Sequence, residues 1–248
     1  MNWSTMSRIH SSAQMHLPRL SLLIATLLLT GCGSAPHPQQ KDPFESFNRG
    51  VYAFNDTVDR AVAKPIAQGY SSVTPGPVKT MVSNFFSNLD DVVVTANDLL
   101  QLKFKQAASD GARVIFNSTF GLLGLINVTD KLEKHNEDFG QTLGYWGVPS
   151  GPYLVLPILG PSTIRDGTGR YADGFASVIS NTKQVPTRNS AWALEGVDTR
   201  AGLLETEKVM DDAVIDRYSF IRDAYLMHRQ SLVYDGNPPR QKFDDDEE

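Results

Sequence analysis

The sequence predicts a mainly α-helical protein with a single folded domain. Apolar residues recur every three or four positions over long stretches, as they do along one face of a helix. Alternation with a period of two, which is typical of strands, is nearly confined to Tyr153-Leu154-Val155-Leu156. The 248 residues contain no repeat of solenoid length and no clear domain boundary.

The first helix of the folded part is expected to begin at Asp42-Pro43-Phe44-Glu45, with Asp42 as the N-cap and Pro43 in the first turn. Because proline lacks the amide hydrogen that a helix interior requires, this helix is expected to end near Pro65. Between these points the apolar residues follow spacings of three and four: Phe44, Phe47, Val51, Phe54, Val58 and Ala61.

Further helices are expected on the same grounds. A turn rich in proline and glycine at 74–77 separates them from the first helix. They are expected at 78–87, 90–102, 105–116, 165–180, 185–211 and 212–233.

Residues 1–31 are predicted to be a lipoprotein signal peptide. Basic residues precede an apolar run at 20–29, which is too short for a hydrocarbon core about 30 Å thick, since a helical span takes about 20 residues. Leu29-Thr30-Gly31-Cys32 then matches a bacterial lipobox, and Cys32 is the only cysteine in the protein. We expect Cys32 to be lipidated and 32–41 to form a short tether to the membrane.

The balance of charge argues against nucleic acid as a partner. The net charge at pH 7 is −5, from 23 basic and 28 acidic residues, and no basic stripe follows any expected element. Acidic residues gather instead at the C-terminus, in Asp244-Asp245-Asp246-Glu247-Glu248. Residues 234–248 are expected to form a solvated tail, with docking to a basic partner as the alternative.

The sequence contains no motif for catalysis or metal binding. It lacks a G-x-S-x-G elbow, a phosphate-binding loop and an H-E-x-x-H helix. His135-Asn136-Glu137-Asp138 offers an imidazole beside carboxylates, but a solvated loop is the favoured interpretation of that stretch. A hydrolase would need His135 or His228, and no serine near them has the local sequence of a nucleophile. We therefore expect no catalytic residue, no metal and no cofactor.

Two long windows carry no charged residue. The window 139–164 contains five glycines and four prolines, so it cannot form one continuous helix. The window 114–129 is most apolar at its centre, 120–126, and fits a buried helix and turn. Irregular backbone is tolerated at membrane depth only where it is buried in protein or lines a cavity. The windows fit either a soluble core or helices and loops that lie in a membrane interface.

A series of short motifs resembles that of the MlaA (VacJ) lipoproteins, and the resemblance covers nearly all of 42–232. The motifs are, in order, Asp42-Pro43-Phe44-Glu45-Ser46-Phe47-Asn48-Arg49, Tyr52-Ala53-Phe54-Asn55, Phe139-Gly140, Thr142-Leu143-Gly144, Gly147, Gly151-Pro152-Tyr153, Leu156-Pro157, Arg165-Asp166, Ala172-Asp173-Gly174-Phe175, Leu194-Glu195-Gly196, Thr199-Arg200-Ala201 and, in the last helix, Arg222, Ala224-Tyr225 and Arg229.

The resemblance implies an outer-membrane lipoprotein of the lipid-asymmetry pathway of Gram-negative bacteria. Members of that family are rings of helices in the inner leaflet, on the periplasmic side, with an amphipathic channel through the middle. They associate with trimeric porins. They pass phospholipid that has strayed into the outer leaflet to a soluble periplasmic carrier, which feeds an inner-membrane ABC transporter. Two alternative functions stay open. The protein could be a structural or adhesion lipoprotein or, as the weaker alternative, a membrane-anchored lipid hydrolase.

The resemblance also assigns candidate residues to the channel and its gating. Phe54 and Asn55 fall on the first-helix motif that controls the channel in the family, although this chain reads Ala53-Phe54-Asn55-Asp56 where some members repeat Asn-Phe-Asn. The segment 120–126 corresponds to a glycine-containing hairpin near the channel, and 139–164 to a channel-side loop. The candidates are Phe54, Asn55, Phe120, Leu122, Leu123, Leu125, Ile126, Gly144, Gly147, Gly151 and Pro152.

Overall fold

The computed structural model describes residues 42–207 and 215–239, and a compact unit begins where the described residues begin. The expected signal peptide, Cys32 and the tether at 32–41 lie outside the described residues. Of the predicted tail at 234–248, residues 240–248 lie outside them as well. The assignments of these segments stay predictions.

Helices dominate the described part of the chain, and the mainly α prediction is confirmed. One antiparallel hairpin is formed by β1 (Tyr153–Leu156) and β2 (Gly160–Thr163), with Tyr153 opposite Thr163. The helices are α2 (Glu45–Val58), the π-helical turn η2 (Asp59–Ala63), α3 (Lys64–Val73), α4 (Gly76–Leu100), α5 (Phe104–Phe120), α6 (Phe139–Tyr145), α7 (Ile164–Ala176), α8 (Val185–Gly202) and α10 (Arg217–Val233).

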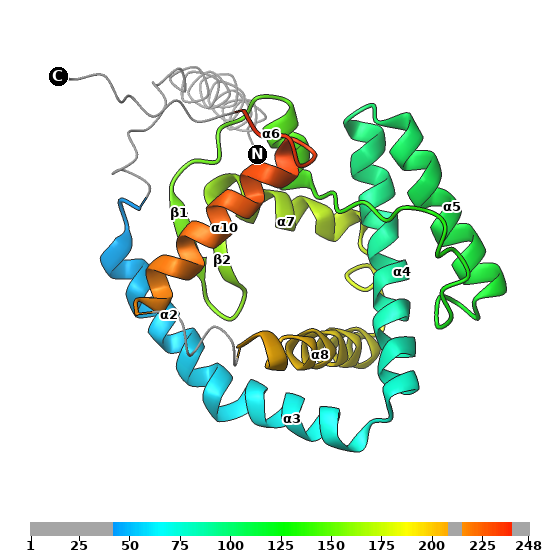
Figure 1. The fold of residues 1–248 in the computed structure, drawn as a ribbon, viewed down its shortest axis with the longest axis horizontal. Helices are drawn as coiled ribbons and strands as arrows, with labels where there is room; N and C mark the ends of the chain where they lie inside the picture. Colours follow the sequence, from blue (N-terminus) through cyan, green and yellow to red (C-terminus); the bar gives the residue numbers. More distant parts are fainter. Residues whose placement is uncertain (1–41, 208–214, 240–248) are drawn as a thin grey trace, which may run out of the picture. The chain divides into compact units, whose positions relative to one another are not determined.

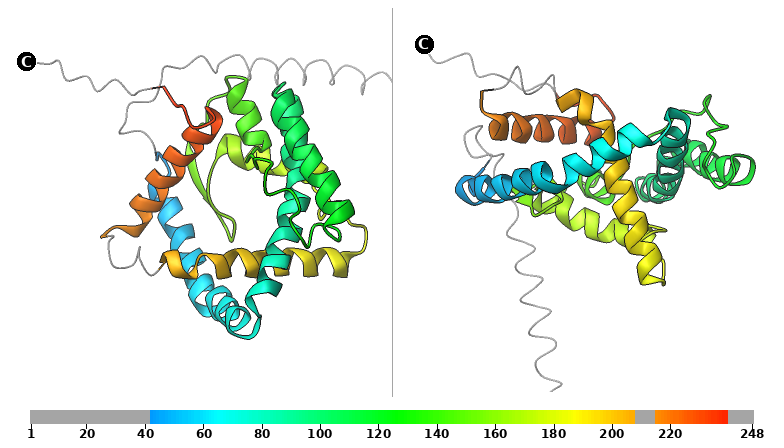
Figure 2. Two further views of the ribbon diagram at one scale, coloured as in Figure 1. Left: turned by 45° about the vertical axis from the view of Figure 1, so that its right-hand side comes forward. Right: turned by 90° about the horizontal axis from the view of Figure 1, so that it is seen from below.

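The elements of this unit follow one another around a ring (Figures 1 and 2). α2, η2 and α3 form one side, α4 the next, and α7 and α10 complete the circuit back to α2. α8 contacts both α3 and α4. α5 lies along the side of α4 that faces away from the β-hairpin, and the turn that joins β1 to β2 extends towards the middle of the ring (Figure 1).

The first helical stretch is longer than the sequence predicts. The chain stays helical from Glu45 to Val73, so the expected end near Pro65 is wrong. The π-helical turn η2 comes directly before α3 and interrupts the regular hydrogen-bond ladder. Pro65 then lies in the first turn of α3, where its missing amide hydrogen is not required.

The two helices expected at 78–87 and 90–102 are one helix, α4. The expected break falls at Asn88, whose amide donates to a serine of α5 over 3.0 Å, and near Asp91, which accepts from Arg113 of α5 over 3.1 Å. Asn and Asp usually weaken helices because their side chains compete for the backbone. Here α5 occupies these side chains, so the helix continues through them.

The later helices have different ends from those expected. α7 ends at Ala176 instead of 180, and α8 ends at Gly202. α10 begins at Arg217, because the Asp216 carboxylate accepts the Ser219 backbone N–H over 3.3 Å and so caps the helix.

Polar residues outnumber apolar ones in the buried part of the described chain. Seventeen polar or charged residues are buried there, against nine apolar ones. Many large apolar side chains are exposed instead, including Phe47, Phe104 and Ile115, each more than 60% exposed. No helix within 42–207 or 215–239 combines the length and hydropathy that a membrane span requires. Apolar exposure on this scale marks a surface that binds other molecules or a membrane.

The contact between α4 and α5 is centred on buried charges. Nδ1 of His135 lies 2.7 Å from Oδ2 of the fully buried Asp110, so the interpretation of 135–138 as a solvated loop is wrong at His135. Asp98 is fully buried too, and neither of its carboxylate oxygens has a hydrogen-bond partner in the described chain. Burial, followed by the nearby carboxylates of Asp110 and Glu137, raises the pKa of Asp98 to about 7.

The raised pKa of Asp98 predicts a loss of stability as pH rises. Between its ordinary pKa of 3.8 and about 7, the folded protein holds a proton that the unfolded chain releases, so the free energy of unfolding falls over that range. Asp98→Asn carries no charge to bury. We expect the advantage of this variant over the parent to grow from pH 5 to pH 8, to a few kcal/mol.

Urea unfolding followed by tryptophan fluorescence in detergent measures this difference. Glu205→Gln is the matched control, because Glu205 is exposed, and its free energy of unfolding should follow that of the parent at each pH. Equal pH dependence in Asp98→Asn and the parent would show that Asp98 is ionised in the folded protein near its ordinary pKa.

Candidate functional site

Two asparagines of α2 hold the β-hairpin. Asn48 donates from Nδ2 to the carbonyl of Tyr153 over 3.0 Å and accepts the amide of Val155 on Oδ1 over 2.9 Å. Asn55 donates to the carbonyl of Leu156 over 2.9 Å and accepts the amide of Ile158 over 2.7 Å. Residues seven apart lie on the same face of a helix. The side-chain amide of Asn48 therefore makes two hydrogen bonds with the open edge of β1, and that of Asn55 makes two with the end of β1 and the turn that follows it.

Asp42 joins the beginning of the first helix to the last one. Its carboxylate accepts from Asn48 over 2.7 Å and from the hydroxyl of Tyr218, and it lies 3.9 Å from the guanidinium of Arg222. The expectation that Asp42 caps the first helix is wrong, because the residue before Glu45 makes no side-chain cap and Asp42 is committed to α10.

An aromatic cluster lies beneath these hydrogen bonds. Tyr153 and Val155 of β1 and Tyr218 of α10 are buried together. The ring of Tyr218 meets those of Tyr52 and Tyr153 at steep angles, with centroids 5.8 and 6.3 Å apart. Such edge-to-face contacts stabilise beyond simple burial. The base of the hairpin is therefore fixed both by packing and by Asn48.

The tip of the hairpin is exposed and held in an uncommon conformation. Ile158 has φ +67° and is 77% exposed, and Leu159 beside it is 57% exposed. A β-branched residue in the left-handed region is strained, at a cost of about 1–3 kcal/mol. Asn55 holds the amide of Ile158 in this conformation. The turn reaches towards the middle of the ring (Figure 2). Its apolar tip is held there by the side chain of Asn55, which we call the Asn55 latch.

Phe54 precedes Asn55 in α2, but its side chain takes no part in the hydrogen bonds that Asn55 makes with the hairpin. Its side chain is 52% exposed and, one position before Asn55, points from a neighbouring face of α2.

Three glycines of 139–164 lie where a side chain would clash or where φ is positive. A Cβ on Gly144 would lie 2.8 Å from Nη1 of Arg165 and 2.9 Å from Val233, so Gly144 permits close contact with α10. Gly147 and Gly151 have φ values of +88° and +69°, which favour glycine. They turn the chain from α6 into β1, and the carbonyl of Pro152 accepts the Ile164 amide over 3.3 Å.

The segment 120–126 is placed elsewhere in the fold. It follows α5 and lies against α4: Asn84 donates to the Leu125 carbonyl over 3.3 Å, and a Cβ on Gly124 would meet Asn88 at 2.6 Å. The side chains of Phe120, Leu122, Leu123 and Ile126 are between 46% and 70% exposed, so burial of this turn within the described chain is wrong. The structure brings Asn55 together with the hairpin but does not bring these residues to it.

A charged cluster at the other end of α10 was missed from the sequence. Arg229 donates to Asp138 over 2.9 Å and to Asp166 over 2.9 Å, and Tyr225 donates to Asp166 over 2.9 Å. Burial opposes ionisation of both carboxyls, but the Arg229 guanidinium outweighs it and lowers the pKa of each. Asp138 also caps α6 through the Gln141 amide over 2.8 Å. The motif contains Arg229, but spacing alone does not reveal partners 63 and 91 residues away.

The described residues hold no group of three His, Cys, Asp or Glu side chains arranged to bind a metal ion. The arrangement supports the positioning of an apolar turn by two asparagine side chains.

Comparison with known proteins identifies the family. The family model of the MlaA lipoprotein matches residues 40–232. The chain is 35% identical to the intermembrane phospholipid transport system lipoprotein MlaA of Escherichia coli K12, over 94% of this chain and 97% of that protein. It is 33% identical to the protein of that name from Haemophilus influenzae, over 88% and 90%.

A solved structure agrees with this relationship. It comes from work on the structural basis for maintenance of bacterial outer membrane lipid asymmetry, and it matches with a TM-score of 0.69 and 32% identity. The match covers 77% of this chain and 98% of that one. Matches of this length in both sequence and structure show that the chain belongs to the MlaA lipoprotein family.

Proposed function

We propose that this protein is an outer-membrane lipoprotein that removes mislocalised phospholipid from the outer leaflet through the middle of its ring and passes it to a periplasmic carrier. It thereby maintains the lipid asymmetry of the outer membrane. Membership of the MlaA family supports this proposal, because relatives covering nearly the whole chain are named for intermembrane phospholipid transport.

The distribution of apolar side chains is the observation that carries the proposal. Large apolar residues are exposed on many described helices while the buried contacts are mostly polar. Leaving such side chains in water costs about 25 cal/mol per Å² of apolar surface. A ring that lies in the membrane interface covers them with lipid. The lipid anchor at Cys32 would hold it in the inner leaflet, on the periplasmic side.

The β-hairpin is the element that we assign to control of the channel. Its apolar tip at 157–160 reaches towards the middle of the ring and is held by two hydrogen bonds with the side chain of Asn55. A phospholipid would pass with its headgroup against polar groups and its acyl chains against apolar side chains such as Leu159. Gly147, Gly151 and Pro152 shape the backbone that leads into this hairpin, and Phe54 flanks the latch.

The partners follow from the same proposal. They are phospholipid, a trimeric porin in the outer membrane and a soluble carrier that feeds an inner-membrane ABC transporter. The protein performs no covalent step and needs no cofactor. A lipid hydrolase is the less favoured alternative, because no serine near His135 or His228 has the local sequence of a nucleophile.

Asn55→Leu is expected to release the hairpin tip. The change removes two hydrogen bonds, which stabilise the fold by about 1–3 kcal/mol together, and leaves the strained Ile158 without its partner. We expect more phospholipid in the outer leaflet and lower resistance to detergent with EDTA, at parental protein levels. Thr57→Val is the control, because Thr57 on the same helix bonds its own backbone at Ala53.

Asn55→Asp refines this test, because a carboxylate still accepts from Ile158 but no longer donates to Leu156. Its effect should fall between those of the parent and Asn55→Leu. Normal asymmetry in Asn55→Leu at parental abundance would mean that the latch has no role in transport.

Leu123→Glu tests the second group of candidate residues. Leu123 is 70% exposed, so the charge should leave the fold intact but oppose contact with lipid or an apolar channel wall. We expect impaired asymmetry from this variant, measured by outer-leaflet phospholipid. Ala108→Glu, which places the same charge at an exposed position of α5, is the matched control. If both variants behave like the parent, the segment 120–126 does not contact the transported lipid.

A further inference from the structure

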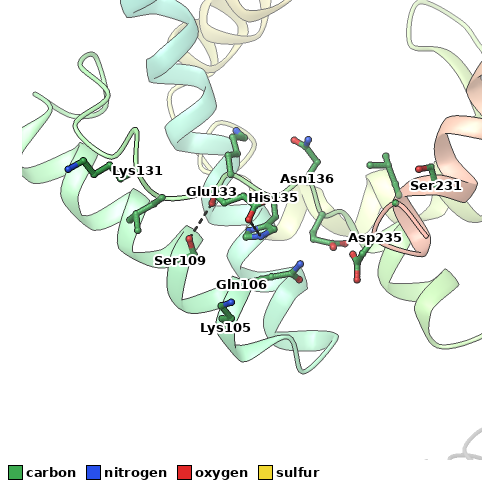
Figure 3. A pocket seen from close by; sticks show the side chains of 14 residues that line it. Lys105, Gln106, Ser109, Lys131, Glu133, His135, Asn136, Ser231 and Asp235 are labelled. Carbon is green, nitrogen blue, oxygen red and sulfur yellow. Dashed lines mark hydrogen bonds and ion pairs between the residues drawn. The ribbon is translucent and has the colours of Figure 1, made fainter. Parts of the chain in front are cut away.

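Two hollows that adjoin each other lie along α5. The chain after the 120–126 turn passes along this helix as the segment 128–137 and lines both hollows with it, and the end of α10 with the turn after it, at 231–236, also lines one of them. One is lined mainly by polar side chains and has a volume of about 720 Å³ (Figure 3). The other is mainly apolar, with a volume of about 650 Å³. Lys131 and Leu132 line both, so they mark the junction.

The apolar hollow is suited to an acyl chain. Phe116 and Phe120 stack one helical turn apart, with ring centroids 6.0 Å apart and an interplanar angle of 22°. Their side chains are 45% and 69% exposed, and Val128 opposite them is 46% exposed. An elongated apolar ligand laid between them would remove all three from water.

The polar hollow contains cations that are free to bind an anion. Neither Lys105 nor Lys131 has a hydrogen-bond or ion-pair partner among residues 42–207 and 215–239. Other charges of the hollow are neutralised within the protein. Glu137 and Asp235 lie 2.8 and 2.6 Å from Lys103. Lys134 lies 3.0 Å from Asp91.

Glu133 is the remaining charge of the polar hollow. Its side chain is 84% exposed, and its carboxylate lies 3.9 Å from Nε2 of His135. Around Lys131 the hollow therefore presents a free cation and, two residues along, an exposed carboxylate. This pairing complements a zwitterionic headgroup, with phosphate against Lys131 and an ammonium group against Glu133.

From this combination we infer that the two hollows between α5 and the segment 128–137 bind one zwitterionic glycerophospholipid, with its phosphate at Lys131 and an acyl chain between Phe116 and Val128. The choice of phospholipid as the ligand rests on the proposed function. The site would be a second place at which the protein binds phospholipid, in addition to the middle of the ring. α5, which carries Phe116 and Phe120, lies on the side of α4 away from the β-hairpin (Figure 1), so the apolar part of this site is separate from the hairpin.

A photoactivatable phosphatidylethanolamine, mixed with the purified full-length protein in detergent, tests the site. Labelled peptides are mapped by mass spectrometry. We expect labelling within 116–132 and, separately, within 153–163. Lys131→Glu and Phe116→Ser should each reduce labelling of 116–132 about tenfold, the effect expected from losing a charge-assisted contact or one side of the apolar hollow. Labelling of 153–163 should not change in Lys131→Glu.

The controls match charge and exposure. Lys183→Glu alters another exposed lysine, and Phe175→Ser alters a phenylalanine of α7 that is 73% exposed, so labelling of 116–132 should stay at the parental level in both. Circular dichroism establishes that each variant is folded.

Labelling confined to 153–163 would overturn this second site and leave the proposed transport intact. Absence of labelling at both peptides would count against both proposals. Labelling of 116–132 by a photoactivatable fatty acid, but not by the phospholipid, would overturn the headgroup assignment and with it the site as proposed.

Discussion

The open edge of β1 is the constraint on which the ring depends. A two-stranded hairpin leaves one strand edge without partners, and an unpaired backbone group away from water is costly. No third strand meets this need among the described residues. α2 meets it with Asn48 and Asn55, whose amides lie two helical turns apart and bond the backbone at four points. This joins the first helix to the centre of the chain and sets where the apolar tip lies.

Polar side chains also link other elements of the ring. Buried apolar contacts are few, so charged and polar links connect its elements. Asp42 connects α2 to α10, and Arg229 connects α10 to the beginnings of α6 and α7. Arg113 connects α5 to α4. Polar links are directional and fix geometry, while they leave many large apolar side chains exposed. Such a division suits a protein whose surroundings are partly hydrocarbon.

The sequence predicts a mainly helical fold because the apolar spacing is regular, but it misplaces several helix ends and does not predict α6. It predicts β1 from a four-residue alternation. The prediction that the first helix ends near Pro65 is wrong because no pattern in the sequence indicates the π-helical turn at 59–63. The prediction of Asp42 as a cap is wrong because a local cap and a distant tyrosine compete for one carboxylate. Asn55 was identified through resemblance to a family, and the Phe-Asn pair that repeats at 47–48 and 54–55 is a signal that could also have indicated Asn48. The partners of Arg229 could not be found in this way, because tertiary packing alone brings them together.

The central claim is that phospholipid passes the hairpin tip in the middle of the ring. A photo-crosslinking amino acid placed at Leu159, which is 57% exposed and at the tip, tests this directly in cells. The account predicts a phospholipid adduct at this position when outer-leaflet phospholipid is raised. Adducts at an exposed position away from the hairpin, such as Leu123, with none at Leu159, would contradict it.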